Sequence, residues 1–371
     1  MSLKNTAPII DLLLTKNLPF AIFRLPETNE FTLICQHDNE VKEIDILDIE
    51  EFRGFVIAPF KCARTGSAFL IRPDLVAKND KEIGALQMKL AQLPDAEVSV
   101  RDMDIENHVI SRHAYINNMD YIIKILQKEE LHKVVLSRVI SCPLQATFSQ
   151  GLLFNQLANE YSGAFVYLFH LPEQGTWAGA SPEALLLIDQ DVASTMALAG
   201  TRLYHPETTN NPWLEKETLE QSFVSQYIAN VLAETGITGY QTETPSTQRA
   251  GHLEHRLTRF TIQAKQLENK AGKMIMGLHP TPAVCGYPKG DAYHLIMRAE
   301  QHDRRFYTGF LGPWNIQGSS QLYVNLRCAE IGEDTLNLYV GGGLTAHSVS
   351  EDEWDETVEK SKTLLSVIEK L

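Results

Sequence analysis

Short apolar runs separated by turn-forming residues are the feature that most constrains the fold of this 371-residue chain. The runs are broken by Pro, Gly, Asn and Asp, a pattern typical of β-strands. Runs of strand length lie at 20–26, 31–36, 54–60, 133–141, 164–171 and 182–188. Two further runs, 321–331 and 335–340, flank a Gly-Glu-Asp turn and predict a hairpin.

Segments with helical spacing of apolar residues lie between these runs. They occupy residues 80–93, 104–128, 149–162, 213–235 and 350–370, with Ser149 as the expected cap of the third. Because strands and helices do not alternate regularly as βαβ units, the pattern predicts an α+β fold. No Pro/Gly/Ser-rich linker divides the chain. We therefore expect a single domain over residues 1–371, with a divergent N-terminal portion over 1–100 and a catalytic part over 105–371.

The charge balance argues against two classes of partner. The chain has 33 Lys and Arg against 47 Asp and Glu, a formal net charge of −14. Nucleic acids and anionic membranes need Lys and Arg, so neither is expected as a partner. No run of 18 apolar residues and no cleavage site occurs near the N-terminus, so no membrane span or signal peptide is expected. Five scattered cysteines without a C-x-x-C spacing predict reduced thiols and a cytoplasmic location.

Two ionisable residues stand beside apolar strands. Lys133 opens the run KVVLSR, where desolvation can bring a lysine toward the pKa range of a general base. The alternative is a strand-end lysine that reaches water. Glu183 follows Gly-Ala-Ser-Pro at the start of another strand, where burial can raise the pKa of a carboxyl and make it a proton donor. The alternative is a solvent-facing turn residue.

Two expected helices carry paired carboxylates. Glu217 and Glu220 are three residues apart, and Glu353 and Glu356 repeat that spacing, so each pair shares a helix face. Carboxylates from two helices suit a hard cation such as Mg2+ together with a substrate oxyanion. The alternative is a solvated face, because Ser350 and Glu353 also match a capping box.

Glycine-containing segments indicate where the backbone can approach a ligand. ALAGTR (197–202) predicts a turn in which Gly200 allows close approach and Thr201 offers a hydroxyl. VGGG (340–343) precedes the last helix and matches neither a dinucleotide-binding fingerprint nor a P-loop. Arg327, in the strand before it, could form a bidentate contact with a carboxylate.

Together and in this order, the motifs resemble the chorismate-utilising enzymes: isochorismate, salicylate, anthranilate and aminodeoxychorismate synthases. The matching segments span roughly residues 130–365: KVVLSR, GASPE, LAGTR, W-x-x-K-E-x-x-E, HPTPAVCGYPK, FYTGFLG, LR, GGG and E-W-x-E-x-x-x-K. The resemblance implies the family's α+β fold, in which a two-layered β core carries helices and the active site lies in a cleft.

Within this family, the resemblance points to water as the nucleophile. Water-using members carry a lysine in the strand that KVVLSR matches, and Lys133 occupies that position, whereas ammonia-using anthranilate synthases typically lack it. Aminodeoxychorismate enzymes commonly have a lysine where this chain has Ala199. No obligatory amidotransferase subunit is therefore expected, and isochorismate synthase is favoured. Salicylate synthase, an ammonia-using synthase and a catalytically silent binding subunit are the alternatives.

The resemblance also implies roles in chorismate chemistry. Lys133 would take a proton from the water that attacks C2 of chorismate, and Glu183 would protonate the departing C4 hydroxyl. The segment EHRLT (254–258) departs from the family pattern at Arg256, whose charge must reach solvent or a partner carboxylate. The residues that would bind chorismate are Gly200, Thr201, His255, Tyr307, Arg327, Gly341, Gly343 and Lys360.

The resemblance implies Mg2+ as the cofactor. Glu220 and Glu356 match the metal ligands, and Glu217 and Glu353 would support them. Relatives often have histidine after the first of these ligands, where this chain has Gln221. Isochorismate feeds both menaquinone and catechol siderophores. Menaquinone synthesis is the expected pathway, although no residue bears on that choice.

Overall fold

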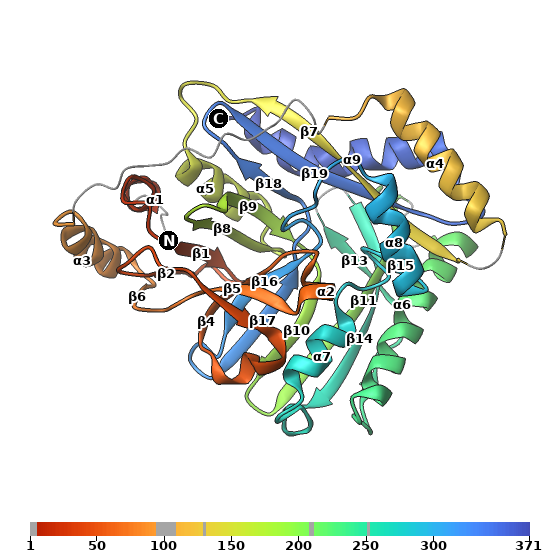
Figure 1. Ribbon diagram of the computed structural model, residues 1–371, viewed down its shortest axis with the longest axis horizontal. Helices are drawn as coiled ribbons and strands as arrows, with labels where there is room; N and C mark the ends of the chain where they lie inside the picture. The colour runs from red at the N-terminus through yellow and green to blue at the C-terminus, as the bar shows by residue number, and fades with distance from the viewer. Residues whose placement is uncertain (1–5, 94–108, 129–130, 208–210, 251–252) are drawn as a thin grey trace.

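The computed structural model describes residues 6–93, 109–128, 131–207, 211–250 and 253–371, whose strands pair antiparallel in two large sheets (Figure 1). Within this part of the chain, the first sheet has the order β15 (Gly286–Tyr287), β7 (Lys133–Pro143), β19 (Thr335–Leu344), β18 (Cys328–Ile331), β9 (Gly175–Ser181), β8 (Phe165–Leu171), β1 (Phe20–Arg24), β2 (Phe31–Cys35), β6 (Leu75–Ala77). The second has the order β12 (Gln241–Thr242), β14 (Leu253–Gln263), β11 (Val192–Leu203), β10 (Ala184–Asp189), β17 (Ser319–Val324), β16 (Phe310–Trp314), β4 (Gly54–Ala58), β5 (Ser67–Ile71), β3 (Lys42–Asp45), and β13 (Ser246–Ala250) also pairs with β14.

Alternation along β8 shows how the sheets pack face to face. Phe165, Tyr167 and Phe169 contribute to an aromatic core shared with the second sheet, and the Phe165 ring stacks on Tyr323 of β17 at 4.2 Å between ring centroids. Successive side chains of a strand point to opposite faces, so the intervening Val166 packs on the helical side. The expected α+β fold with a two-layered β core is confirmed.

Helices cover the outer faces of both sheets (Figure 1). Those on the first sheet include α1 (Thr6–Thr15), α3 (Asp80–Leu90), α5 (Gln150–Glu160) and α9 (Ser350–Ile368). Those on the second are α6 (Glu215–Glu234) and α7 (Ala271–Leu278), while α4 (Arg112–Leu126) and α8 (Lys289–Ala299) pack beside β7, and α2 (Cys62–Thr65) is a single turn. None of the described helices is long and apolar enough to cross a lipid bilayer.

Most expected elements form, with differences at their ends. The cap expected at Ser149 is confirmed, because its hydroxyl accepts from the Leu152 amide. The helix expected over 104–128 begins only at Arg112, and residues 104–108 lie outside the described part of the chain. At the last helix the capping-box interpretation is wrong: Val349 is the N-cap residue, and the Ser350 hydroxyl donates to Asp120 instead.

The expectation of one strand over 321–331 is wrong, because the chain changes sheets within it. β17 ends at Val324 in the second sheet, and β18 begins at Cys328 in the first. Arg327, expected within a strand, lies in this crossover with a φ of 47°. The hairpin therefore consists of β18 and β19 alone.

The turn expected over 197–202 is also wrong. These residues belong to β11, whose pairing with β14 shifts between Ala199 and Thr201. Gly200 is the extra residue, with a φ of 80° that favours glycine. A bulge of this kind bends a strand locally and redirects its side chains.

The N-terminal residues supply strands to both sheets. β1, β2 and β6 extend the first sheet from β8, and β4, β5 and β3 extend the second from β16. The division into a divergent portion over 1–100 and a catalytic part over 105–371 stays a prediction.

Candidate active site

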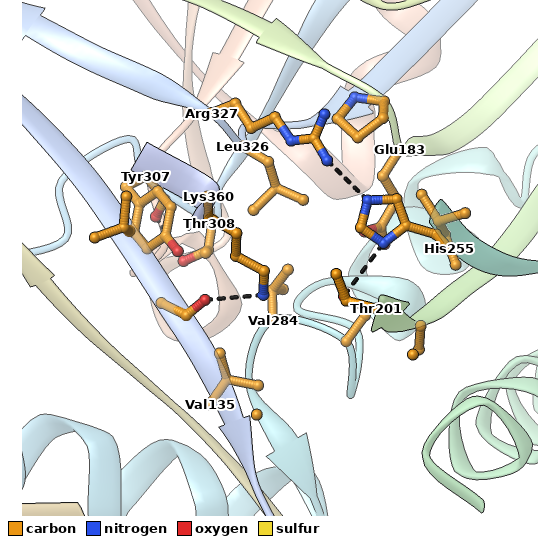
Figure 2. A pocket seen from close by; sticks show the side chains of 18 of the residues that line it. Val135, Glu183, Thr201, His255, Val284, Tyr307, Thr308, Leu326, Arg327 and Lys360 are labelled. Atoms are coloured by element: carbon orange, nitrogen blue, oxygen red, sulfur yellow. Dashed lines mark hydrogen bonds between the residues drawn. The ribbon is translucent and has the colours of Figure 1, made fainter. Parts of the chain in front are cut away.

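One pocket collects residues from both sheets and from the β17–β18 crossover (Figure 2). Its walls are partly apolar, with Val135, Leu198, Val284, Leu326 and Val340 among the lining residues. The site residues expected from the sequence that line it are Glu183, Gly200, Thr201, Glu220, His255, Tyr307, Arg327, Gly341, Gly343 and Lys360. Four expected site residues do not line the pocket: Lys133, Glu217, Glu353 and Glu356.

Lys133 lies directly behind the wall of the pocket. It is the first residue of β7, is 0% exposed, and donates from Nζ to Glu220 Oε1 at 2.7 Å. Gly343 of β19, which pairs with Val135, lines the pocket and lies between it and Lys133. A Cβ at position 343 would lie 2.9 Å from Lys133 Cε and 3.1 Å from Glu220 Oε1. The glycine therefore lets the lysine and the carboxylate share this wall.

Glu183 provides a buried carboxyl in the same pocket. It lies between β9 and β10, is 2% exposed, and accepts a hydrogen bond from Thr281 Oγ1 at 3.4 Å. Burial raises the pKa of Glu183 to about 8, although the charge of Lys133, the Thr281 hydrogen bond and the charge of Lys360 act in the opposite direction. The carboxyl is therefore protonated at neutral pH and can donate a proton.

Glu220 has the opposite electrostatic character. Burial favours its neutral form, but the charge and hydrogen bond of Lys133, with the charges of Lys360 and Lys216, hold its pKa below the ordinary value. The pocket thus contains one protonated and one ionised carboxyl, whose environments differ in their cationic partners.

Arg327 is held at the pocket by a neutral histidine (Figure 2). Its Nη2 donates to His255 Nε2 at 2.7 Å, and His255 Nδ1 lies 3.3 Å from Thr201 Oγ1. Burial and the charges of Arg327 and Lys360 lower the pKa of His255 well below its ordinary value. An arginine can only donate, so Nε2 is the acceptor and the proton of the neutral ring is on Nδ1.

Lys360 adds a second cation. Its Nζ donates to the Gly341 carbonyl oxygen at 3.0 Å and pairs with Glu356 Oε1 at 2.7 Å. Tyr307 lies beside Gly341, where a Cβ would be 3.0 Å from the tyrosine hydroxyl and 2.8 Å from the Leu136 carbonyl oxygen. Burial raises the pKa of Tyr307, so its hydroxyl stays protonated and can donate.

The four helical glutamates are neutralised in part by lysines. Besides the Lys133–Glu220 and Lys360–Glu356 pairs, Lys216 Nζ lies 2.7 Å from Glu353 Oε1. Among the described residues, however, Glu217 Oε2 and Glu353 Oε2 are buried without a hydrogen-bond partner. Buried carboxylate oxygens without donors fit a bound cation.

Among the described residues, one group of three His, Asp or Glu side chains meets at the spacing of metal ligands, and it does not include the four helical glutamates. The group consists of His37, Asp38 and Asp74, at the surface. Arg72 Nη2 already pairs with both aspartates, at 2.6 and 3.3 Å. The cluster is thus explained by its own ion pairs.

Two departures from the family pattern meet at one place in the structure. Gln221 Nε2 donates to Thr258 Oγ1 at 2.6 Å, joining α6 to β14. Arg256, expected to need solvent or a carboxylate, is half-buried and donates from Nη1 to Thr218 Oγ1 at 2.7 Å. The partly exposed side chain is compatible with the solvent alternative, and the printed contact of its guanidinium is with a hydroxyl.

Sequence reasoning missed residues that act behind the lining. Thr281 lies in the quoted motif HPTPAVCGYPK, but nothing in the motif alone shows that its hydroxyl reaches Glu183. Three lining residues were missed as well, because they carry no recognisable pattern of their own: Thr308, Ala283 and Val284. Their only signal was membership of the conspicuous motifs around them.

Curated proteins similar to this chain include isochorismate synthases. The vibriobactin-specific isochorismate synthase of Vibrio cholerae is 28% identical over 263 residues, which cover 69% of this chain and 67% of that protein. The isochorismate synthase EntC of Escherichia coli K12 is 33% identical over 247 residues, covering 64% of this chain and 62% of that protein. The chain thus spans about two thirds of the length of these relatives.

Solved structures share the fold over nearly the whole chain. A Bacillus anthracis protein assigned as the 2,3-dihydroxybenzoate-specific isochorismate synthase DhbC has a TM-score of 0.77 and 25% identity, covering 97% of this chain and 99% of its own. The menaquinone-specific isochorismate synthase MenF of Escherichia coli, at 18% identity, has a TM-score of 0.78, with 97% and 91% covered. This second likeness supports the fold.

A family model described as "Chorismate binding enzyme" matches residues 51–369, most of the chain. The match includes every element that contributes a residue to the pocket. The chain belongs to the family of chorismate binding enzymes.

Proposed function

We propose that this protein is an isochorismate synthase, which adds water at C2 of chorismate and removes the C4 hydroxyl. One observation supports this most directly: a buried lysine, Lys133, and a protonated buried carboxyl, Glu183, serve one pocket that also contains two cationic side chains. A general base, a general acid and a binding site for a dianion are the parts that this exchange of hydroxyl groups requires.

The proposed proton transfers balance over the reaction. In the reactive form of the site, which follows release of the Lys133 ammonium proton to solvent, Lys133 takes a proton from water as the water oxygen bonds to C2, and Glu183 gives its proton to the C4 hydroxyl, which leaves as water. The ring double bonds shift, so no oxidant or reductant is needed. Afterwards Lys133 is cationic and Glu183 is anionic. Their charges interact favourably in the pocket, and returning one proton restores the starting state.

The two carboxylates of chorismate would be bound by Arg327 and Lys360, with a hydrogen bond from Tyr307. His255 orients the guanidinium of Arg327 without adding charge, because its ring is neutral. Local cations of this kind let a protein of net charge −14 bind a small dianion.

We also propose Mg2+ as the cofactor, held by Glu220 and Glu356 with Glu217 and Glu353 in support. Glu217 Oε2 and Glu353 Oε2, the buried carboxylate oxygens without hydrogen-bond donors among the described residues, support this assignment. When bound, the ion supplies positive charge for a substrate carboxylate.

The test is incubation with chorismate and Mg2+, with and without ammonia, followed by liquid chromatography and mass spectrometry. We expect a product of unchanged mass and altered retention whose yield depends on Mg2+ and not on ammonia. Salicylate with pyruvate would instead indicate a salicylate synthase, and an aminated product would overturn water as the nucleophile. Chorismate that binds but is not consumed would favour a silent binding subunit.

A further inference from the structure

Arg304, in the segment after α8, uses its whole guanidinium group in the interior. The side chain is 2% exposed and does not line the pocket. Its five N–H groups match five contacts. They are Nε to Glu300 Oε2 at 2.8 Å, Nη1 to the Val284 carbonyl at 2.9 Å and Thr308 Oγ1 at 3.2 Å, and Nη2 to the Val135 carbonyl at 2.6 Å and Glu300 Oε1 at 2.6 Å.

Glu300 fixes this guanidinium against β7. Its Oε1 also accepts from the Ser137 amide at 2.7 Å and the Ser137 hydroxyl at 2.8 Å. Arginine and carboxylate bind each other through two parallel hydrogen bonds, a geometry that a lysine cannot reproduce. The pair is therefore rigid and oriented as well as neutralised.

The two backbone carbonyls bound by Arg304 belong to different walls of the pocket. Val135 is two residues from Lys133 on β7, and its amide donates to the Cys285 carbonyl at 2.8 Å. Val284 lies in the segment whose amide groups at 284 and 285 donate to the Thr281 carbonyl at 3.1 and 3.0 Å. Thr281 in turn donates to Glu183. One side chain thus joins the strand of Lys133 to the segment that contacts Glu183.

We propose that Arg304, held by Glu300, is a positioning residue that sets the spacing between Lys133 and Glu183. The inference rests on the proposed function, in which these two residues are the base and the acid. Its physical basis is that an error of about 1 Å in the placement of reacting groups can cost on the order of 100-fold in rate.

The test compares two variants with a matched control, in the full-length protein. Arg304→Lys keeps the charge but loses the two-pronged geometry. Glu300→Gln/Arg304→Met removes both charges, so that no unpaired buried charge prevents folding. The control is Arg305→Lys, the same substitution one residue later. Arg305 pairs with buried Glu330 and donates to the Gln174 carbonyl at 2.6 Å, and neither partner lines the pocket.

For Arg304→Lys and for the double variant we expect kcat to fall about 10- to 100-fold, with the KM for chorismate within about threefold of the unmodified protein. Arg305→Lys should lower Tm by a similar amount while kcat stays within about twofold. Folded Arg304 variants with unchanged kcat, or equal losses of kcat in Arg304→Lys and Arg305→Lys, would overturn the positioning role of Arg304. The proposed function would still stand. An unmodified protein that does not convert chorismate would overturn the proposed function as well.

Discussion

At the scale of single residues, Lys133 is the side chain on which the proposed chemistry depends most. In Lys133→Ala we expect kcat to fall about 10²- to 10⁴-fold, the usual contribution of a general base. The fold should persist, because Glu220 keeps the nearby charges of Lys360 and Lys216. Chorismate turnover and a thermal melt of the same preparation check this. Near-normal turnover by a folded variant would remove Lys133 from the mechanism.

Glu183 predicts a pH dependence of stability whose sign follows from its raised pKa. Between the ordinary carboxyl value of 4.5 and about 8, the unfolded chain releases this proton and the folded chain retains it. Stability therefore falls as pH rises through that window. Glu183→Gln does not titrate, so its Tm should exceed that of the unmodified protein by a margin that grows from pH 5 to pH 8.

The same substitution should abolish turnover, because glutamine cannot donate the proton. In the unmodified protein, kcat should decline above about pH 8 as Glu183 ionises. Melting curves at several pH values and a kcat profile measure the two effects separately. Parallel Tm profiles for the two proteins would show that the carboxyl is not buried in its neutral form.

At the scale of elements, two neighbouring glycines of β19, Gly342 and Gly343, have different amounts of space for a side chain. A Cβ at 343 would lie 2.9 Å from Lys133 Cε, whereas a Cβ at 342 meets nothing closer than Glu353 Oε2 at 3.4 Å. We expect Gly343→Ala to lower kcat at least tenfold by displacing Lys133, and Gly342→Ala to have a much smaller effect. Equal kcat values in the two variants would show that the space in front of Lys133 is not needed.

Helix α9 contains Glu356, one of the two proposed Mg2+ ligands. Glu356→Gln should raise the Mg2+ concentration for half-maximal activity at least tenfold, because an amide replaces a charged ligand. Glu359→Gln is the control on the same helix, since Glu359 pairs with the exposed Lys362. Mg2+ titrations of both variants give the comparison. An unchanged midpoint in Glu356→Gln would exclude this carboxylate as a ligand.

The elements also show where sequence reasoning succeeds and where it stops. Periodicity located strands such as β7, β8 and β19 and helices such as α5 and α6, because a strand or helix buries one face along its own length. It gave no expectation for β9, β14 or β16. It could not show the change of sheets between Val324 and Cys328, since both strands are apolar runs of similar character. Nor could it show the bulge at Gly200, because a Gly-Thr pair looks the same in a turn and in a bulged strand.

The candidate active site, too, could be predicted from the sequence only in part. The sequence supplied ten of the residues that line the pocket, but not the contacts behind them. The hydrogen bonds from Thr281 to Glu183 and from Arg304 to the Val135 and Val284 carbonyls join segments distant in the sequence. Such contacts arise only when the two sheets and their connections are placed in space.

At the scale of the whole molecule, cationic side chains gather at the pocket although the protein as a whole is acidic. The protein carries a net charge of −14, yet Lys133, Arg327 and Lys360 converge at one pocket. The two lysines pair with glutamates from α6 and α9, whereas the guanidinium of Arg327 donates to the neutral ring of His255 and keeps its positive charge. The field that selects a dianion is therefore built at the site and does not come from the surface as a whole.

The division at residue 100 can also be tested at this scale. A chain reduced to residues 105–371 would lack β1, β2 and β6 of the first sheet and β4, β5 and β3 of the second. It would expose the edges of β8 and β16 and the aromatic core around Phe165, which packs with Phe23 at 5.9 Å between ring centroids. Unpaired strand edges beside exposed apolar surface favour aggregation.

We therefore expect the 105–371 fragment to be insoluble or to melt without a cooperative transition, and to be inactive toward chorismate. Size-exclusion chromatography, a thermal melt and the turnover assay check this against the full chain. Supplying residues 1–104 as a second chain should restore soluble protein if the sheets assemble across the break. A fragment that melts cooperatively and converts chorismate would show that the motif-bearing part is a domain by itself, with the N-terminal strands as an addition to it.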